Sequence, residues 1–367
     1  MKVTFPYMSN SHIAITNILE GLGNEVIPPP KPSKLTLSYG TKYAPEFACV
    51  PFKITLGTYI ETLEMGADTI VSTGGVGPCR AGLYTTLQEK ILRNIGYEFE
   101  MITFEPPSRY LKDIIRNFKK LVNKKVSLVE IIKLIWFAWE QLTLLDEVEL
   151  ESFKIRPCEV KRGETTRAYR KIVDIIAQAK NRDDLKEARK LADKIYSSVD
   201  RYEDVDPLKI ALLGEIYVVM EPTANLEIEE TLGELGAYVE RTMFFTDYTI
   251  NNAITDLFHL KGDRDAKKAA VPYFNEMCGG HGRESVGNTI LYAEKGFDGV
   301  IQVAPFTCIP EIVAKSILPT VAEEYGIGFL SISIDEQTGK AGIQTRLEAF
   351  VDLLARKRKK KREEKIA

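Results

Sequence analysis

Apolar and polar positions along the chain follow a rhythm in which short apolar runs alternate with stretches of helical periodicity. Runs such as 2–5 and 209–214 have the length of buried strands, and apolar positions three or four residues apart follow them. Strands that alternate with helices of this length are typical of a parallel sheet covered by helices on both faces. Because the rhythm occurs before residue 108 and again after residue 206, we expect an α/β protein with two such units.

Turn residues mark the bounds of the elements that this pattern predicts. Glycines follow several of the predicted helices, and Pro51 suits the first turn of a helix that begins after Cys49. The predicted strands are 2–5, 25–27, 68–73, 99–104, 209–214, 236–241, 299–303 and 328–334. The predicted helices are 13–22, 36–42, 51–65, 82–94, 109–150, 164–200, 225–235, 247–258, 264–275, 284–295, 310–325 and 345–354.

The middle of the chain differs from both ends, because it has long helical periodicity, mixed charge and few glycines. We therefore expect two pseudo-equivalent flavodoxin-like or Rossmann-like doubly wound parallel-sheet units, joined by a helical segment. The predicted divisions are an N-terminal α/β unit at 1–107, the helical connecting segment at 108–206, a C-terminal α/β unit at 207–350 and a basic tail at 351–367. The run of lysines and arginines at 356–362 predicts a solvated, frayed tail.

Four of the five cysteines form two pairs with matched spacing. Cys49 and Cys79 are separated by the same 30 residues as Cys278 and Cys308. In each pair the first cysteine precedes a predicted helix, and the second follows the next strand, at the edge where open α/β sheets carry their functional crevice. A free cysteine is more often a small buried apolar residue. The matched spacing instead favours a metal site, and four thiolates suit an iron–sulfur cluster as well as zinc.

Charged residues near these cysteines are candidates for contact with a cofactor. Lys53, Arg80 and Arg283 would neutralise an anionic cluster or receive a phosphorylated ligand such as coenzyme A, although a solvated charge is the default interpretation. His281, three residues past the third cysteine, is a further candidate ligand, with a hydrogen bond inside its loop as the alternative. Cys158 has no counterpart in the other half, and we interpret it as structural.

Composition and charge narrow the classes of function. The chain has 367 residues, of which 44% are apolar and 28% charged, so a sizeable core is expected, and its net charge of −3 gives no reason to expect a nucleic-acid partner. The N-terminus has no apolar signal region and no apolar run is long enough to span a bilayer, so we expect a cytoplasmic protein without a membrane partner. In a reducing compartment its cysteines are expected to be free, metal-binding or catalytic.

The motifs around the four cysteines resemble those of a known family. They are Ala-Cys49-Val-Pro-Phe-Lys, Gly-Val-Gly-Pro-Cys79-Arg, Glu-Met-Cys278-Gly-Gly-His-Gly and Ala-Pro-Phe-Thr-Cys308-Ile-Pro. With the closing segment 335–350, they resemble the 2-hydroxyglutaryl-CoA dehydratase D-component superfamily, and most closely its acyl-CoA dehydratase activase-related ("CoA protein activase") branch. The resemblance implies two flavodoxin-like units around an oxygen-sensitive [4Fe–4S] or related cluster, with three or four cysteine ligands.

The resemblance also implies partners. It predicts an electron-donating, ATP-hydrolysing activator or reductase protein, and a CoA thioester or another small molecule as a candidate substrate, in a homo- or hetero-oligomer. This chain lacks the actin-like phosphate-binding opening of the activator, so ATP hydrolysis is expected of the partner. The loop Gly74-Gly-Val-Gly77 lacks the Gly-Lys-Ser/Thr ending of a phosphate loop and does not fit the dinucleotide fingerprint.

Three hypotheses for function follow. The first is an iron–sulfur protein of low-potential electron transfer, or of reductive or dehydratase chemistry, whose enzyme class would be lyase or ATP-coupled reductase component. The second is a non-catalytic module in which zinc or a cluster holds the two halves together. The third, a nucleotide-binding Rossmann enzyme, ranks last because its fingerprint is absent.

Overall fold

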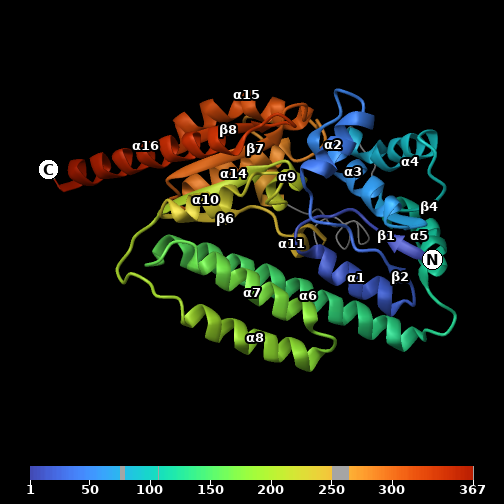
Figure 1. Cartoon of the computed structure of the whole chain (residues 1–367). Helices are drawn as coiled ribbons and strands as arrows, with labels where there is room; N and C mark the ends of the chain where they lie inside the picture. The colour runs from blue at the N-terminus through green and yellow to red at the C-terminus, as the bar shows by residue number, and fades with distance from the viewer. Residues whose placement is uncertain (75–78, 106, 250–263, 367) are drawn as a thin grey trace. The chain divides into compact units, whose positions relative to one another are not determined.

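The computed structural model describes residues 1–74, 79–105, 107–249 and 264–366 (Figure 1). The chain forms two compact units. The first unit consists of Met1–Thr143 with Phe245–Gly262, and the second unit of Leu144–Phe244 with Asp263–Ala367. Each contains a four-stranded sheet in which every pair of neighbouring strands is parallel. The predicted α/β class, with two doubly wound units, is therefore confirmed.

The sheet of the first unit has the strand order β2-β1-β3-β4. Its strands are β1 (Lys2–Thr4), β2 (Glu25–Val26), β3 (Thr69–Thr73) and β4 (Glu100–Phe104). The helices before β4 are α1 (Ser11–Gly21), α2 (Lys34–Tyr43), α3 (Val50–Glu64), the 3₁₀ turn η1 (Arg80–Leu83) and α4 (Tyr84–Asn94). Those after it are α5 (Pro107–Leu121), the first half of α6 (Leu128–Ile155) and α11 (Phe245–Thr249).

Two apolar clusters cover the two faces of this sheet. On one face α3 and α4 pack against β3 through Phe52, Leu92 and Ile70, all of which are fully buried. On the other face α1, α5 and α6 form a cluster with β1 and β4 that includes Leu22 and Ile102. Burial of these side chains is the main source of stability for such a layered unit.

The sheet of the second unit has the order β6-β5-β7-β8, which matches that of the first unit strand for strand. Its strands are β5 (Leu208–Gly214), β6 (Ala237–Arg241), β7 (Gly299–Pro305) and β8 (Gly328–Ile334). Before β6 lie the rest of α6, η2 (Arg156–Cys158), α7 (Glu164–Gln178), α8 (Arg182–Ser197), α9 (Ile216–Met220) and α10 (Ile228–Glu234). After it come α13 (Arg264–Ala269), α14 (Gly282–Glu294), α15 (Ile309–Glu324) and α16 (Lys340–Ile366).

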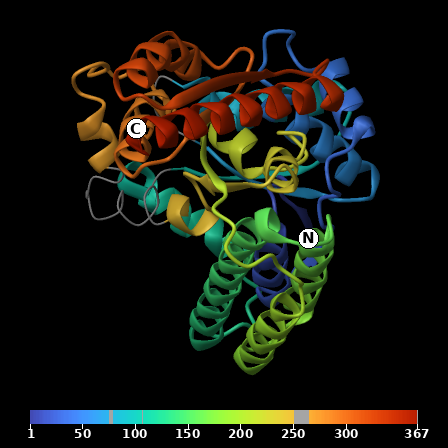
Figure 2. The same cartoon turned by 90° about the vertical axis from the view of Figure 1, so that its left-hand side faces the viewer.

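Helices also cover both faces of the second sheet. The side chains of α10 and α16, among them Leu232 and Leu347, pack on one face against the strands β5 to β8. Figure 2 shows α16 lying along this sheet. The other face is covered by α14 and α15, where Tyr292 and Ala322 contact residues of β5 and β7. The central strands β5 and β7 are thus buried between two helical layers, which explains the nearly continuous apolar sequence of β5.

Most of the predicted elements that lie within the described residues agree with the structure. The short helix α9 was not predicted, and the predicted helix 225–235 begins only at Ile228. The predicted helix 247–258 lies almost entirely outside the described residues. The helical stretches predicted at 109–150 and 164–200 each form two helices, α5 with α6 and α7 with α8. They are divided between the units, because α5 and the first half of α6 belong to the first and the rest of α6, α7 and α8 to the second.

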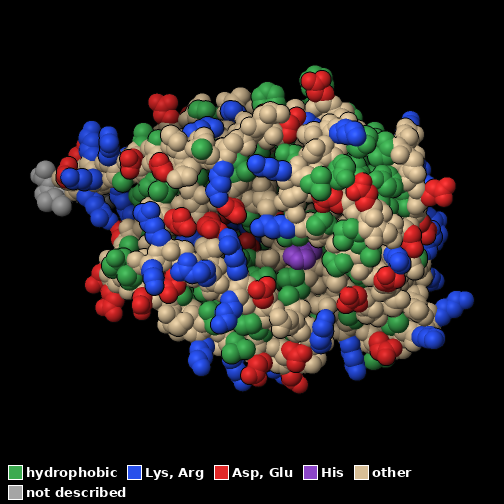
Figure 3. All heavy atoms as spheres, viewed as in Figure 1, with side chains coloured by type: hydrophobic (Ala, Val, Ile, Leu, Met, Phe, Trp, Pro, Cys, Tyr) green, Lys and Arg blue, Asp and Glu red, His purple; other side chains and the backbone are tan. Residues whose placement is uncertain are grey.

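The prediction of a frayed basic tail is wrong, because α16 continues to Ile366. Ion pairs of Arg358 account for the continued helix. The Arg358 guanidinium pairs with Asp206 at 2.7 Å and lies 3.7 Å from Asp298, and both aspartates belong to the same unit as α16. Arg362 pairs with Asp206 as well. Figure 3 shows lysine and arginine side chains gathered at this end of the helix. Within the described part of the chain, no helix is long and apolar enough to cross a membrane.

Candidate functional site

Cys49 lies at the start of α3 in the first unit. It is the N-cap residue, with an extended backbone (φ −71°, ψ 157°), and Pro51 occupies the first turn as the sequence predicts. Its side chain is buried, and its Sγ contacts the hydroxyl of Tyr84 at the start of α4. One turn further along α3, the buried Lys53 donates a hydrogen bond from Nζ to the carbonyl oxygen of Glu46, 3.1 Å away.

Cys79 lies just past β3 and is the N-cap of η1, which leads directly into α4. The preceding residues 75–78, which hold most of the predicted glycine-rich loop, lie outside the described residues. Thr85 fixes the start of α4 to the end of β3 by donating from Oγ1 to the carbonyl oxygen of Thr73 at 2.9 Å. Tyr84 is the first residue of α4 and directly follows η1, which Cys79 caps. The contact between the Tyr84 hydroxyl and Cys49 Sγ therefore brings the two cysteine segments of the first unit to one end of its sheet.

Hydrogen bonds and a glycine contact fix the helices that carry these cysteines. Gln88 of α4 donates from Nε2 to Thr55 Oγ1 of α3 at 2.7 Å. A Cβ atom at Gly57 would lie 1.9 Å from the carbonyl oxygen of Thr36, so α3 can cross α2 at this distance only with glycine there. The position of Cys49 is thus determined by backbone packing behind it.

Cys308 occupies the equivalent place in the second unit. It follows β7, the strand that corresponds to β3, and it is the N-cap of α15 with an extended backbone (φ −79°, ψ 100°). Pro310 lies in the first turn of α15, as Pro51 does in α3. The prediction that the second cysteine of each pair lies between a strand end and a helix start therefore agrees with both units.

Cys278 differs from Cys49, because the N-cap of α14 is not the cysteine but His281, three residues later. The intervening Gly279 and Gly280 have positive φ angles of 78° and 51°, which glycine adopts without strain. A Cβ at Gly280 would lie 2.9 Å from Cγ of Pro310, so this loop packs directly on the segment that follows Cys308. The second unit therefore also brings its two cysteine segments together.

The remaining predicted residues have clear surroundings. Arg283 donates from Nη2 to the carbonyl oxygen of Lys267 at 3.0 Å and to Oδ1 of Asn275 at 3.3 Å, so it fixes α14 to the segment before Cys278. Arg80 is partly buried in the turn after Cys79. Cys158 lies in η2, and burial raises the pKa of its thiol. None of the five cysteines, all of which the structure describes, forms a disulfide.

These surroundings are compatible with metal ligation by the four cysteines. None of the four forms a disulfide, three of them cap helices, and the loop of the fourth contains glycines that let backbone approach closely. Among the residues that the structure describes, no three His, Cys, Asp or Glu side chains form a group that could hold a metal ion. A site with four cysteine ligands needs both units, and it stays a prediction.

Two acidic residues of the second unit were missed in the sequence. Glu215 directly follows β5, and Glu311 lies in the first turn of α15, three residues after Cys308. Burial raises the pKa of each carboxyl group to about 7. The signal that could have found Glu215 is its placement at a predicted strand end, where the sequence Leu-Leu-Gly-Glu215 sets an acid directly after an apolar strand.

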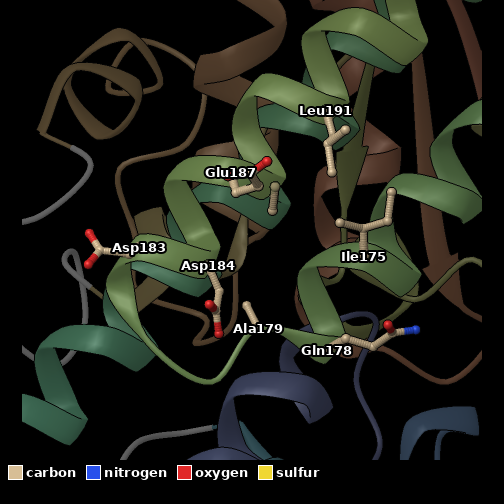
Figure 4. Close-up of a pocket in the computed structure, with 8 residues that line it drawn as sticks. Ile175, Gln178, Ala179, Asp183, Asp184, Glu187 and Leu191 are labelled. Atoms are coloured by element: carbon tan, nitrogen blue, oxygen red, sulfur yellow. The ribbon is translucent and has the colours of Figure 1, made fainter.

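A groove on the helices α7 and α8 of the second unit is a different kind of surface. It has a volume of about 460 Å³ and is lined by Ile175 and Leu191 together with Asp183, Asp184 and Glu187 (Figure 4). Asp183 pairs with Lys186 at 2.7 Å and Asp184 accepts a backbone hydrogen bond, so these carboxylates have partners on the helix start itself.

Comparison with known proteins identifies no family, because neither a protein-family model nor a curated protein matches the sequence.

Proposed function

We propose that the chain is an iron–sulfur protein of low-potential electron transfer, in which Cys49, Cys79, Cys278 and Cys308 supply the ligands of a [4Fe–4S] or related cluster. The observation that supports this most directly is the repetition of one arrangement. In each unit a cysteine precedes the helix that leads to the third strand of that unit, and a second cysteine caps the helix after that strand.

The arrangement suits thiolates for a physical reason. Helix starts present N–H groups without intrahelical partners and a partial positive charge, and both favour the ionised form of a thiol. When bound, an iron–sulfur cluster supplies one-electron chemistry at a potential that its surroundings adjust. The protein's own contribution is to hold three of the thiols at helix starts and to give the loop of the fourth, Cys278, close backbone packing through glycines such as Gly280.

The family resemblance of the cysteine motifs extends the proposal to partners. An ATP-hydrolysing activator or reductase would deliver the electron, and a CoA thioester or another small molecule would be the substrate if the chain is itself catalytic. Lys53, Arg80, His281 and Arg283 are the residues next to the thiols from which contacts to such a cofactor or substrate are proposed. The enzyme class would then be a lyase or an ATP-coupled reductase component, in the cytoplasm.

The alternative is a non-catalytic module in which the same thiols bind zinc or a cluster for structure alone. It uses the same donor set, because four thiolates also satisfy tetrahedral zinc. Metal content separates the two, since zinc is colourless and does not change oxidation state.

Purification without oxygen tests both. We expect brown protein that contains iron and acid-labile sulfide and bleaches on reduction. Cys79→Ser and Cys308→Ser should lose most of the iron, because each thiol is fixed at a strand end. The matched control is Cys158→Ser, which should retain it. Colourless protein with stoichiometric zinc would establish the alternative, and protein without either metal would refute both. Equal iron loss in the Cys158 variant would disprove the ligand assignment.

A further inference from the structure

The first half of α6 exposes an apolar face in the first unit. The five large apolar side chains of this face are Leu128 (72% exposed), Val129 (60%), Ile132 (58%), Ile135 (49%) and Trp136 (58%). Residues three and four apart share a side of a helix, so their spacing places them along one side of α6. Single exposed apolar residues are ordinary, but several that adjoin one another mark a surface that binds a partner.

The opposite side of this helix is fixed to its own unit. Ile131 and Leu134 pack into the cluster formed with α1, α5 and β4, and a Cβ atom at Gly21 of α1 would lie 2.7 Å from a methyl carbon of Leu134. Gln141 accepts a hydrogen bond from Asn17 of α1 at 2.8 Å, so α1 lies beside α6 (Figure 1). Over these residues α6 is therefore apolar on both sides, which is typical of a helix that is covered on both sides.

The exposed face is a formed helical surface from its first residue. Ser127 and Glu130 make a capping box, in which the Ser127 N–H donates to Glu130 Oε2 at 2.7 Å and the Glu130 N–H donates to Ser127 Oγ at 3.3 Å. At the other end the indole N–H of Trp136 donates to Oε1 of Glu140 at 3.0 Å, which satisfies the polar atom of this exposed ring. A partner therefore meets a surface that is already ordered, and binding costs little conformational entropy.

The positions of the five side chains are symmetric about Ile132. Leu128 and Trp136 lie four residues before and after it, and Val129 and Ile135 lie three residues before and after it. Two copies of α6 that cross antiparallel at Ile132 would therefore place each leucine against a tryptophan and each valine against an isoleucine. A two-fold interface between identical chains requires this kind of self-complementary surface.

The charges at the two ends of the face fit the same pairing. An antiparallel crossing at Ile132 brings the turn before α6, which carries Lys124 and Lys125, to Glu140 of the partner subunit. The Glu140 carboxylate can accept from an ammonium group as well as from the indole, because a carboxylate has about four acceptor positions. Opposite charges at the rim therefore favour the antiparallel arrangement over a parallel one, which would bring like charges together.

The area of the face is sufficient for a dimer. At about 200 Å² for each side chain, the exposed fractions of the five amount to roughly 600 Å² per copy. A dimer would then bury roughly 1,200 Å² in total, which is the lower end of the range for specific protein–protein interfaces.

We propose that the apolar face of α6 is the interface of a homodimer, in which the α6 helices of two chains cross antiparallel at Ile132. The five apolar side chains form the core of the interface, and the lysines of the preceding turn pair with Glu140 at its rim. The inference concerns association alone and does not depend on the proposed metal chemistry.

Sedimentation of the purified full chain at concentrations from about 1 to 100 μM measures the oligomeric state. We expect the wild type to reach twice the chain mass of 41.3 kDa. Ile132→Glu should stay a monomer, because it brings two like charges together at the centre of the interface, and its exposed position leaves folding intact. Leu353→Glu is the matched control: this leucine of α16 is 57% exposed, and its replacement should leave the dimer unchanged. A dimer that persists in Ile132→Glu, or a wild type that is monomeric at every concentration, would overturn the proposal.

A charge exchange tests the antiparallel register. Glu140→Lys should weaken the dimer several-fold, and Lys124→Glu with Lys125→Glu in the same chain should restore it, with circular dichroism to verify that each variant is folded. If the second change fails to restore the dimer, the register is refuted. A monomeric wild type that sediments with vesicles of anionic lipid, and loses this binding in Ile132→Glu, would assign the face to a membrane surface and refute the homodimer.

Discussion

Replacement of Glu311 by glutamine should change how the stability of the protein depends on pH. The buried carboxyl group accepts hydrogen bonds from Ser285 and Gln302, and glutamine can keep both contacts, since its oxygen accepts from Gln302 and its nitrogen donates to Ser285. The substitution therefore removes a titrating proton at nearly constant shape. Any difference between the two proteins above neutral pH then reports the cost of the buried charge.

The magnitude follows from the raised pKa. Burial raises the pKa of Glu311 from 4.5 to about 7, with the charges of Glu215 and Glu284 acting in the same direction. The folded state therefore binds more protons than the unfolded state between these two values, so the stabilisation is fully present below about pH 4.5 and is lost as pH rises through about 7. At about 1.4 kcal/mol per pKa unit, the wild type should lose about 3 kcal/mol of unfolding free energy across this interval.

Urea unfolding followed by circular dichroism at about pH 5, 7 and 8.5 checks this. The unfolding free energy of Glu311→Gln, measured relative to wild type, should rise by about 3 kcal/mol from the acidic to the alkaline end. Glu215 still titrates in the variant, so the difference between the proteins is the quantity to compare. Parallel pH profiles would show that Glu311 ionises without cost in the folded state, and the reasoning would fail.

Three further substitutions test the packing and the ion pairs of the second unit. Arg241→Met leaves two buried glutamates without their cation and should lower the unfolding free energy by about 3–5 kcal/mol in urea titrations, and a neutral result would contradict the buried ion cluster. Gly287→Ala would place a Cβ 1.8 Å from the carbonyl oxygen of Ala266 and should cost about 1–3 kcal/mol in the same assay, whereas Gly342→Ala meets no atom within 4 Å and should be harmless. Asp206→Asn removes the exposed acceptor of two arginines, so it should lower the melting temperature slightly in dilute buffer and not in concentrated salt.

The elements that sequence reasoning predicted best are those determined by local periodicity. The strands of both sheets agree within a few residues, because each is a short apolar run between turn residues. The helix starts at Cys49 and Cys308 were also predictable, since a proline in the first turn marks them. These signals lie within a few residues of the feature that they predict.

Features that depend on distant parts of the chain could not be predicted in this way. The buried surroundings of Glu311 arise because β7 lies beside β5 and α14 packs on α15, which brings together Glu215, Ser285 and Gln302. Likewise, the basic run of α16 looks frayed in isolation, and its pairing with Asp206 appears only in the folded unit. A charged residue is solvated or buried according to its tertiary neighbours, which no local pattern contains.

The structure also separates what is common to the two cysteine loops from what is particular to each. In both units the helix behind the first cysteine crosses the preceding helix at a glycine, Gly57 in α3 and Gly287 in α14, where a Cβ would meet a backbone carbonyl oxygen within 2 Å. Because the two backbones touch at each crossing, the helix that follows the first cysteine cannot move far without losing this contact. The backbone of α3 and of α14 is therefore held in place. The first thiols nevertheless differ, because Cys49 caps its helix directly while two glycines separate Cys278 from His281. Cys278 is therefore the thiol with the most freedom to adjust, and an imidazole that could replace it lies three residues away.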